Sequence, residues 1–319
     1  MVYHEIAVEP TAVEDLKDLG LVERMFGFEH GRLVAFLPAK PKDSGCWISV
    51  LYGHMKTMLP PEKHKDLELR VLRLLDRAGY RSRNSSKIAE GQSWCDLALQ
   101  EQSASPFAAI LCAGKSGNSA MLPFQGLHDP DDTFPVFLRE PVHFADSMKD
   151  PETFLNALKP LIVSAKRLDF IDPYFDPTHP EEANRRRWQM TIRNLADFLR
   201  SSNRLTADLH FHTQLDEAQE PETFVRNIAN EISGRFPPTT TLKVTAWSQK
   251  PRGIRFHARY LITDKAGVAL EYGTDMGSNR RTDITLLPRA LAEIRRKEFD
   301  PNTPSTFNVE ATIQVSGTR

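Results

Sequence analysis

The chain has 319 residues, of which 40% are hydrophobic and 26% are charged, and its formal net charge is -1. This length suits one large domain or two ordinary domains with buried cores. The balanced charge excludes a protein that is basic throughout, so any contact with nucleic acid or a membrane surface depends on a local basic patch.

The cysteines and the apolar runs indicate the setting of the protein. Cys46, Cys95 and Cys112 are an odd number without paired spacing, which argues against a disulfide framework or a zinc knuckle. No apolar run approaches the roughly 20 residues that a membrane-spanning helix needs. The N-terminus lacks the basic and apolar regions of a signal peptide. We therefore expect a cytoplasmic protein without integral membrane contact.

The first 150 residues predict a small mixed α+β domain. Helices are expected from the apolar spacing at 13–25 and 67–78, and strands at 32–37, 46–52 and 107–112. The first two strands suggest a hairpin or a pair of neighbouring strands. Gly114-Lys115-Ser116 follows the last strand, but Ala109 stands where a phosphate-binding loop requires glycine, so we expect no such loop.

The second half of the chain is more regular. Residues 126–150 are rich in Asp, Pro and Phe, which places a domain boundary near residue 150 and predicts domains 1–150 and 151–319. Helices and strands then alternate, which predicts an α/β fold with helices packed on a mixed sheet. The expected order is helix 154–162, strand 167–172, helix 188–199, strand 207–212, helix 224–236, strand 241–247, strand 256–263, strand 268–272, strand 283–287, a charged helix to 298 and strand 307–315.

The stretch from Gly253 to Asp264 carries the most distinctive chemistry. In a strand, alternate side chains share a face, so His257 and Arg259 are expected beside one another on the face opposite to Phe256. A guanidinium forks two hydrogen bonds onto an anionic oxygen, and an imidazole can attack or protonate, so the pair suits phosphate chemistry. The alternative is an exposed strand face with two ordinary polar residues.

Further residues give this stretch a context. Asp264 completes the spacing His-x-Arg-x4-Asp, Gly273-Thr274-Asp275 follows it, and Asp172-Pro173-Tyr174 ends an earlier predicted strand. This order resembles the phospholipase D-like superfamily, whose signature is His-x-Lys-x4-Asp followed by a small-residue segment. The arginine variant is similar to the phospholipase D-like domain at the C-terminus of MIT-domain proteins and to bacterial relatives. The resemblance covers about residues 150–319.

The resemblance implies a metal-independent phosphodiesterase that needs no cofactor. In the superfamily one histidine attacks phosphorus, a basic residue holds the phosphate oxygens and a second histidine protonates the leaving group. His257 would then be the nucleophile and Arg259 the phosphate clamp. Asp172 or Asp275 is the better candidate to orient the imidazole.

Thr263 and Asp264 are expected to form the structural turn of the motif. Asp264 follows Thr263 at the strand end with the opposite parity to His257, so it is predicted to accept backbone hydrogen bonds from the following turn. The chain contains one motif of this kind, since the similar segments at His30 and His54 lack its aspartate. An active enzyme would therefore pair two chains across a two-fold axis.

Two functions remain open from the sequence. The first is a nuclease-like phosphodiesterase that acts on nucleic acid as a homodimer, and its bacterial relatives suggest defence against foreign DNA. The second is a catalytically inactive module that binds phosphate groups or a protein partner, with residues 1–150 making contacts. The role of Arg259 differs little between them, whereas His257 is essential only to the first.

Smaller signals concern anions and metals. Arg255, Arg280 and Arg281 are candidates to line a phosphate groove, with Arg252 and the run Arg185-Arg186-Arg187, or else to form a solvated surface.

His210 and His212 share a predicted strand face, a geometry that suits a metal. Asp208 lies on the same face and Asp216 follows the strand, but no nearby cluster has matching ligand spacing, so no metal is expected.

Overall fold

The computed structural model describes residues 2–37, 46–77, 81–82, 92–114, 120–140, 144–202, 208–216, 218–276 and 280–319. The chain divides into two compact units, one of Tyr3–His143 and one of Met1–Val2 with Phe144–Arg319. The division falls at residues 143 and 144, where the sequence places a boundary near 150. Gly114 is described, but Lys115 and Ser116 lie outside the described residues.

The N-terminal unit is built on a five-stranded parallel sheet with the order β3-β2-β1-β4-β5. Its strands are β1 (His4–Val8), β2 (Arg32–Phe36), β3 (Arg81–Ser82), β4 (Ala109–Cys112) and β5 (Met121–Pro123). Its helices are α1 (Leu16–Met25), α2 (Trp47–Met58), α3 (His64–Arg77), α4 (Trp94–Ala104) and α5 (Val136–Arg139). Short 3-10 helices are η1 (Pro10–Ala12), η2 (Phe28–His30), η3 (Pro61–Lys63) and η4 (Phe124–His128).

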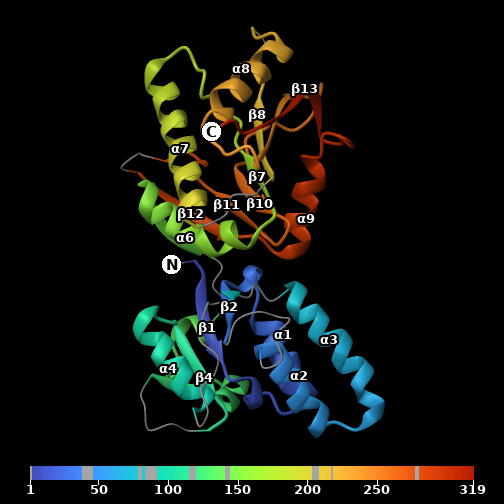
Figure 1. Ribbon diagram of the computed structural model, residues 1–319. Helices are drawn as coiled ribbons and strands as arrows, with labels where there is room; N and C mark the ends of the chain where they lie inside the picture. The colour runs from blue at the N-terminus through green and yellow to red at the C-terminus, as the bar shows by residue number, and fades with distance from the viewer. Residues whose placement is uncertain are drawn as a thin grey trace. The chain divides into compact units, whose positions relative to one another are not determined.

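Helices cover both faces of this sheet, as Figure 1 shows. On β1, Ile6 and Val8 pack into one apolar cluster with α1, α2 and α3, whereas Ala7 packs into a second cluster with α4. Alternation along a strand sends neighbouring side chains to opposite faces, which produces these two layers. β1 lies between β2 and β4, so the strand order reverses there as in doubly wound folds.

The predicted strand at residues 46–52 is wrong, because this segment is the start of α2. Trp47, Ile48, Leu51 and Met55 are buried at helical spacing, and the Trp47 indole N–H donates to the Val8 carbonyl. A short apolar run fits a buried strand or a buried helix equally well, and packing against the sheet decides between them. The expected hairpin is therefore absent from the described residues, and β2 pairs in parallel with β1 and β3.

The C-terminal unit is built on an eight-stranded mixed sheet with the order β13-β9-β8-β7-β10-β11-β12-β6. Its strands are β6 (Phe144–Met148), β7 (Arg167–Ile171), β8 (Asp208–Gln214), β9 (Thr241–Gln249), β10 (Tyr260–Thr263), β11 (Gly267–Leu270), β12 (Arg281–Leu286) and β13 (Phe307–Ser316). Its helices are α6 (Pro151–Ser164), α7 (Glu182–Ser201), α8 (Pro221–Ser233) and α9 (Arg289–Glu298). β7, β8 and β9 are parallel, and the other pairings are antiparallel.

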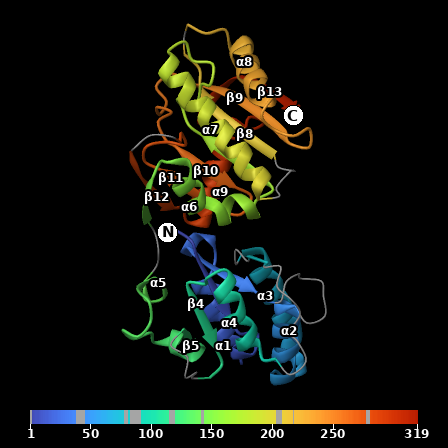
Figure 2. The same ribbon diagram turned by 60° about the vertical axis from the view of Figure 1, so that its left-hand side comes forward.

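Aromatic side chains fill both faces of this sheet. On one face Phe170 and Phe211 stack near α7, whose Trp188 contacts Phe175 edge-on. On the other face Phe256 packs against Phe299, which caps α9. Figures 1 and 2 show α7 and α9 on opposite sides of the strands. The predicted α/β class, with helices flanking a mixed sheet, is confirmed.

Two details of the C-terminal sheet differ from the prediction. The expected strand 256–263 is regular only as β10, so His257 and Arg259 lie in the segment that leads into it. β6 was not predicted; it forms the edge of the sheet beside β12. Within the described ranges, no helix combines the length and apolarity that crossing a bilayer requires.

Candidate anion-binding site

Arg259 and Asp172 meet where β7 ends and β10 begins. The strands are antiparallel and Tyr260 pairs with Ile171, so the residue before Tyr260 lies beside the residue after Ile171. The Arg259 Nε lies 3.9 Å from Asp172 Oδ1, and Arg259 Nη1 donates to the Glu271 carbonyl at 2.7 Å. The register of the sheet therefore places a guanidinium over a buried carboxylate.

The Asp172 carboxylate ties the following loop to the end of β7. It accepts the backbone N–H of Tyr174 at 3.1 Å, and both the N–H and the hydroxyl of Thr274, at 2.9 and 3.3 Å. Burial raises the pKa of Asp172, although these hydrogen bonds and Arg259 act to lower it. Asp172 thus fixes the segment Gly273-Thr274-Asp275.

A buried ion pair forms the floor of the site. Lys149 Nζ contacts Asp275 Oδ1 and donates to the Tyr272 carbonyl at 2.6 Å, and the two charged side chains are only 2% and 9% exposed. Burial lowers the pKa of Lys149, and Asp275 opposes that change. Arg187 Nε lies 3.6 Å from Asp275 Oδ2, and this buried nitrogen has no hydrogen-bond partner among the described residues.

These groups surround a cavity of about 330 Å³. The described residues that line it are Lys149, Asp172, Tyr174, Arg187, Trp188, Arg259, Tyr272, Asp275 and Arg280. Four of them are cations and two are carboxylates, which leaves an excess of two positive charges when all are ionised. The excess of positive charge therefore favours an anion in this cavity.

Gly273 is needed for the close approach of the loop to Asp172. Its φ is +87°, and a Cβ atom there would lie 2.6 Å from Asp172 Oδ2. We expect Gly273→Ala to lower the free energy of unfolding by about 1–3 kcal/mol and to weaken anion binding. Gly234→Ala is the control, because nothing lies within 4 Å of its added methyl group. Equal urea denaturation midpoints for the two variants would contradict this role.

His257 does not line this cavity. It is exposed and lines a separate hollow of about 260 Å³ together with Arg259, Glu271 and Asp283. The two predicted residues share this hollow, and of the two only Arg259 also lines the cavity around Lys149. The acidic neighbours of His257 give its hollow the opposite charge to the cavity around Lys149.

Thr263 and Asp264, both expected to shape the turn of the motif, have different partners in the structure. The Thr263 Oγ1 accepts the N–H groups of Lys265 and Ala266, both at 3.0 Å, and so shapes the turn. Asp264 Oδ1 instead accepts the N–H groups of Lys166 and Arg167, at 2.7 and 3.3 Å. The expected bonds from Asp264 to the following turn are wrong, because its carboxylate is directed to the start of β7.

The predicted arginines separate in the structure. Arg280 lines the cavity, and Arg255 lines a neighbouring pocket of about 670 Å³ that also contains Tyr174 and Arg187. Arg281 instead pairs with Asp146 on β6, with 70% of its side chain exposed. Of the arginines named for the phosphate groove, Arg280 and Arg187 therefore line the cavity itself.

Sequence reasoning missed Lys149 and the specific position of Arg187. Lys149 follows β6, a strand inside the segment that looked irregular, so no pattern indicated that its side chain is buried. Arg187 lies one turn before Thr191 on α7, and the Thr191 hydroxyl accepts the N–H of Met276 at 2.7 Å. That spacing was available in the sequence, but the contact with the loop after β11 was not.

His210 and His212 do lie side by side, with ring centroids 3.8 Å apart, and their partner is Asp169 on β7. Trp247 Nε1–H donates to His212 Nδ1 at 3.1 Å, so the neutral ring carries its proton on Nε2, which lies 3.3 Å from Asp169 Oδ1. These hydrogen bonds hold the His212 ring between Trp247 and Asp169. Asp169 adds a carboxylate to the two histidines, and the three ligand atoms lie within 4.8 Å of one another.

Asp169 is a buried carboxylate held by three donors. Arg167 Nη2 donates to its Oδ1 at 2.7 Å, and His210 Nδ1 lies 3.3 Å from the same oxygen. Burial acts to raise the pKa of Asp169, but the hydrogen bonds of His210 and His212 outweigh it and hold the pKa far below its usual range. Burial lowers the pKa of His210 to about 3, so both partners favour an ionised aspartate beside a neutral imidazole.

No protein-family model matches the chain, and a search of curated proteins finds no significant match. The resemblance to the phospholipase D-like superfamily therefore remains a prediction from the motif.

Proposed function

We propose that the C-terminal unit binds a phosphate group in the cavity around Lys149, Arg187 and Arg259, as a catalytically inactive phospholipase D-like module. The observation that carries this proposal is the buried Nε of Arg187, which is ion-paired with Asp275 but has no hydrogen-bond partner among the described residues, in a cavity with an excess of two positive charges. Guanidinium groups bind phosphate oxygens through paired hydrogen bonds, and an anion supplies the acceptor that this nitrogen lacks among the described residues.

The positions of the nucleophiles favour binding over hydrolysis. The described residues that line the cavity include no histidine, cysteine, serine or threonine. His257 lies in the hollow that contains Glu271 and Asp283, whose charges repel a phosphate. A nucleophile must reach the reacting atom, so this arrangement favours a site that holds the anion without cleaving its ester.

Nucleic acid is the proposed source of the phosphate. Tyr174 is 49% exposed, and the guanidinium carbon of Arg259 lies 5.1 Å from the centroid of its ring. An aromatic face beside a phosphate-binding arginine suits a single strand, because bases stack on such rings. The neighbouring pocket with Arg255 gives the strand room to continue.

Hydrolysis across a homodimer is the second candidate. His257 is exposed, so its imidazole is open to a second copy of the chain, as a two-fold active site requires. In that case the protein is a metal-independent nuclease, and the motif suggests a role in bacterial defence against foreign DNA.

One experiment separates the two candidates. Fluorescently labelled single-stranded DNA and RNA are titrated with the full-length protein in EDTA, and affinity and cleavage are measured together. We expect Arg259→Gln to weaken binding about 10- to 100-fold, the loss of a charged hydrogen bond, with no cleavage by any variant. His257→Ala and the exposed control Arg281→Gln should bind like the wild type.

Two outcomes would overturn the binding proposal. Unchanged affinity in Arg259→Gln would show that the cavity does not hold the phosphate. Cleavage in EDTA that His257→Ala abolishes would establish the second candidate instead.

A further inference from the structure

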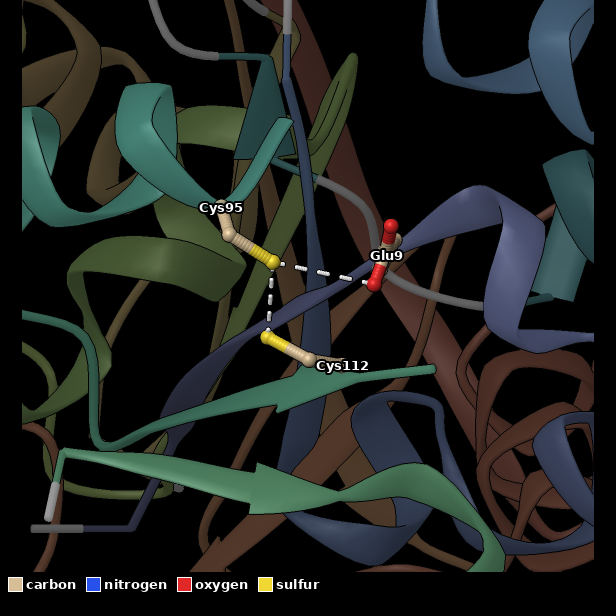
Figure 3. Close-up of side chains that lie close together, drawn as sticks. All are labelled: Glu9, Cys95 and Cys112. Atoms are coloured by element: carbon tan, nitrogen blue, oxygen red, sulfur yellow. Dashed lines mark hydrogen bonds between the residues drawn. The ribbon is translucent and has the colours of Figure 1, made fainter. Parts of the chain in front are cut away.

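Two of the three cysteines meet in the N-terminal unit, although they are 17 residues apart in the chain. Cys95 is the second residue of α4, and Cys112 is the last residue of β4. Their sulfur atoms are 3.1 Å apart, and Figure 3 shows both side chains directed toward the same point. All residues between Cys95 and Cys112 are described, so the structure defines the whole segment that joins the two thiols.

The sulfur atoms are near enough for a covalent bond. A disulfide measures about 2.0 Å between its sulfurs, so a shift of about 1 Å between the two side chains completes it. Cys95 is half-buried and faces an oxidant more readily than Cys112, which is buried. The more accessible sulfur thus reacts first, and the buried sulfur is placed to resolve the product.

Glu9 lies beside the pair, directly after β1. Its Oε2 lies 3.7 Å from Cys95 Sγ and accepts the N–H of Ala113 at 2.7 Å, while its Oε1 accepts the hydroxyl of Thr11 at 3.0 Å. These bonds hold the carboxylate in place. Burial raises the pKa of both thiols, so the resting pair is protonated, and Glu9 is the acceptor in position for the Cys95 proton.

We propose that Cys95 and Cys112 form a site of reversible oxidation, which a peroxide converts to an intramolecular disulfide. Cys95 sulfur attacks one peroxide oxygen, the O–O bond breaks, and the leaving hydroxide takes up the thiol proton by way of Glu9 and departs as water. Cys112 sulfur then attacks the sulfenic acid, the S–S bond forms, the S–O bond breaks and a second water leaves. Two thiols are oxidised and one hydrogen peroxide is reduced to two waters.

A metal ion suits this cluster less well. A zinc ion holds two thiolates at about 2.3 Å each, which in tetrahedral geometry sets the sulfurs about 3.8 Å apart. The observed 3.1 Å separation is shorter, so a zinc ion would have to force the two cysteines apart. Both oxygens of Glu9 also have protein donors already.

The position of the pair gives the bond a structural effect. β4 neighbours β1 at the point where the order of this parallel sheet reverses, and ligands of doubly wound folds bind at the carboxyl ends of strands there. A disulfide ties the first turn of α4 to the end of β4. Oxidation thus restrains the carboxyl-end edge of the sheet, where doubly wound folds bind their ligands.

The test uses the full-length protein and hydrogen peroxide as the oxidant. After brief treatment and denaturation, we expect the titratable thiols to fall from three to one, and dithiothreitol to restore all three. Peptide mapping without reduction should recover the segments that contain Cys95 and Cys112 as one linked species. A rise in the melting temperature of the oxidised protein should accompany the bond.

Matched variants make the result decisive. Cys46→Ala removes the third cysteine and should leave the linked species intact, while Cys95→Ser and Cys112→Ser should each abolish it. Circular dichroism confirms that each variant is folded before treatment. Three free thiols after treatment, a linkage through Cys46, or a tightly bound zinc ion that shields Cys95 and Cys112 from alkylation would overturn the proposal.

Discussion

Replacing Lys149 by methionine is expected to lower the free energy of unfolding by about 3–5 kcal/mol. Among the described residues, the change leaves the Asp275 carboxylate, 9% exposed, with Arg187 at 3.6 Å as its remaining ion-pair partner. A buried charge without its partner costs more than the pair contributes, because it has lost its hydration. Urea denaturation, followed by circular dichroism, measures the difference.

Two controls separate burial from the simple loss of a charge. Arg281→Met removes a cation whose partner, Asp146, lies at the surface, and its free energy of unfolding should stay close to that of the wild type. The double variant Lys149→Met with Asp275→Leu removes both buried charges and should recover most of the loss. If Lys149→Met were as stable as the wild type, the claim that Lys149 and Asp275 form a buried ion pair would be contradicted.

Acid should destabilise the C-terminal unit through His210. Its pKa lies near 3 in the folded protein, against an ordinary value of 6.5, because burial disfavours the imidazolium. Between these values the unfolded chain binds more protons than the folded protein, so stability falls as the pH falls. From pH 6 to pH 4 the loss from His210 is about 2–3 kcal/mol.

The variant His210→Asn tests this linkage. Its amide keeps a donor toward Asp169 but does not titrate, so the decline in stability between pH 6 and pH 4 should be smaller than in the wild type. The difference between the two pH profiles removes the contribution of His4, whose pKa burial also lowers. Urea denaturation at several pH values gives both profiles, and parallel profiles would rule out a buried neutral His210.

Periodicity was a reliable guide to the C-terminal fold. The helices and strands from residue 154 to the end of the chain lie close to their predicted places, since long amphipathic stripes leave little choice of structure. The segment at Trp47 failed because its apolar side chains fit either a helix or a strand. Only contact with the sheet resolves that ambiguity.

The candidate site was predictable in part. Arg259, Asp172 and Asp275 came from the motif and its neighbours, and they do surround one cavity. Lys149 reaches the cavity because β6 pairs with β12, and Arg187 reaches it because α7 packs against the loop after β11. Neither contact leaves a local pattern in the sequence. For His257 the sequence suggested a role that its position does not favour. Its spacing in the motif suited catalysis, but it lies beside Glu271 and Asp283.

The proximity of Cys95 and Cys112 also has no local signature. Their separation of 17 residues matches no paired spacing, and the crossover from α4 to β4 alone brings them together. Contacts of this kind depend on how a helix packs against the strand that follows it, which local sequence patterns do not encode.

The most direct test of phosphate binding is a crystal structure of the full-length protein soaked with tungstate, an anomalously scattering analogue of phosphate. We predict one strong anomalous peak in the cavity, within hydrogen-bond distance of Arg187 and Arg259, and its loss in Arg259→Gln crystals. A peak beside His257, with the cavity around Lys149 empty, would contradict the account.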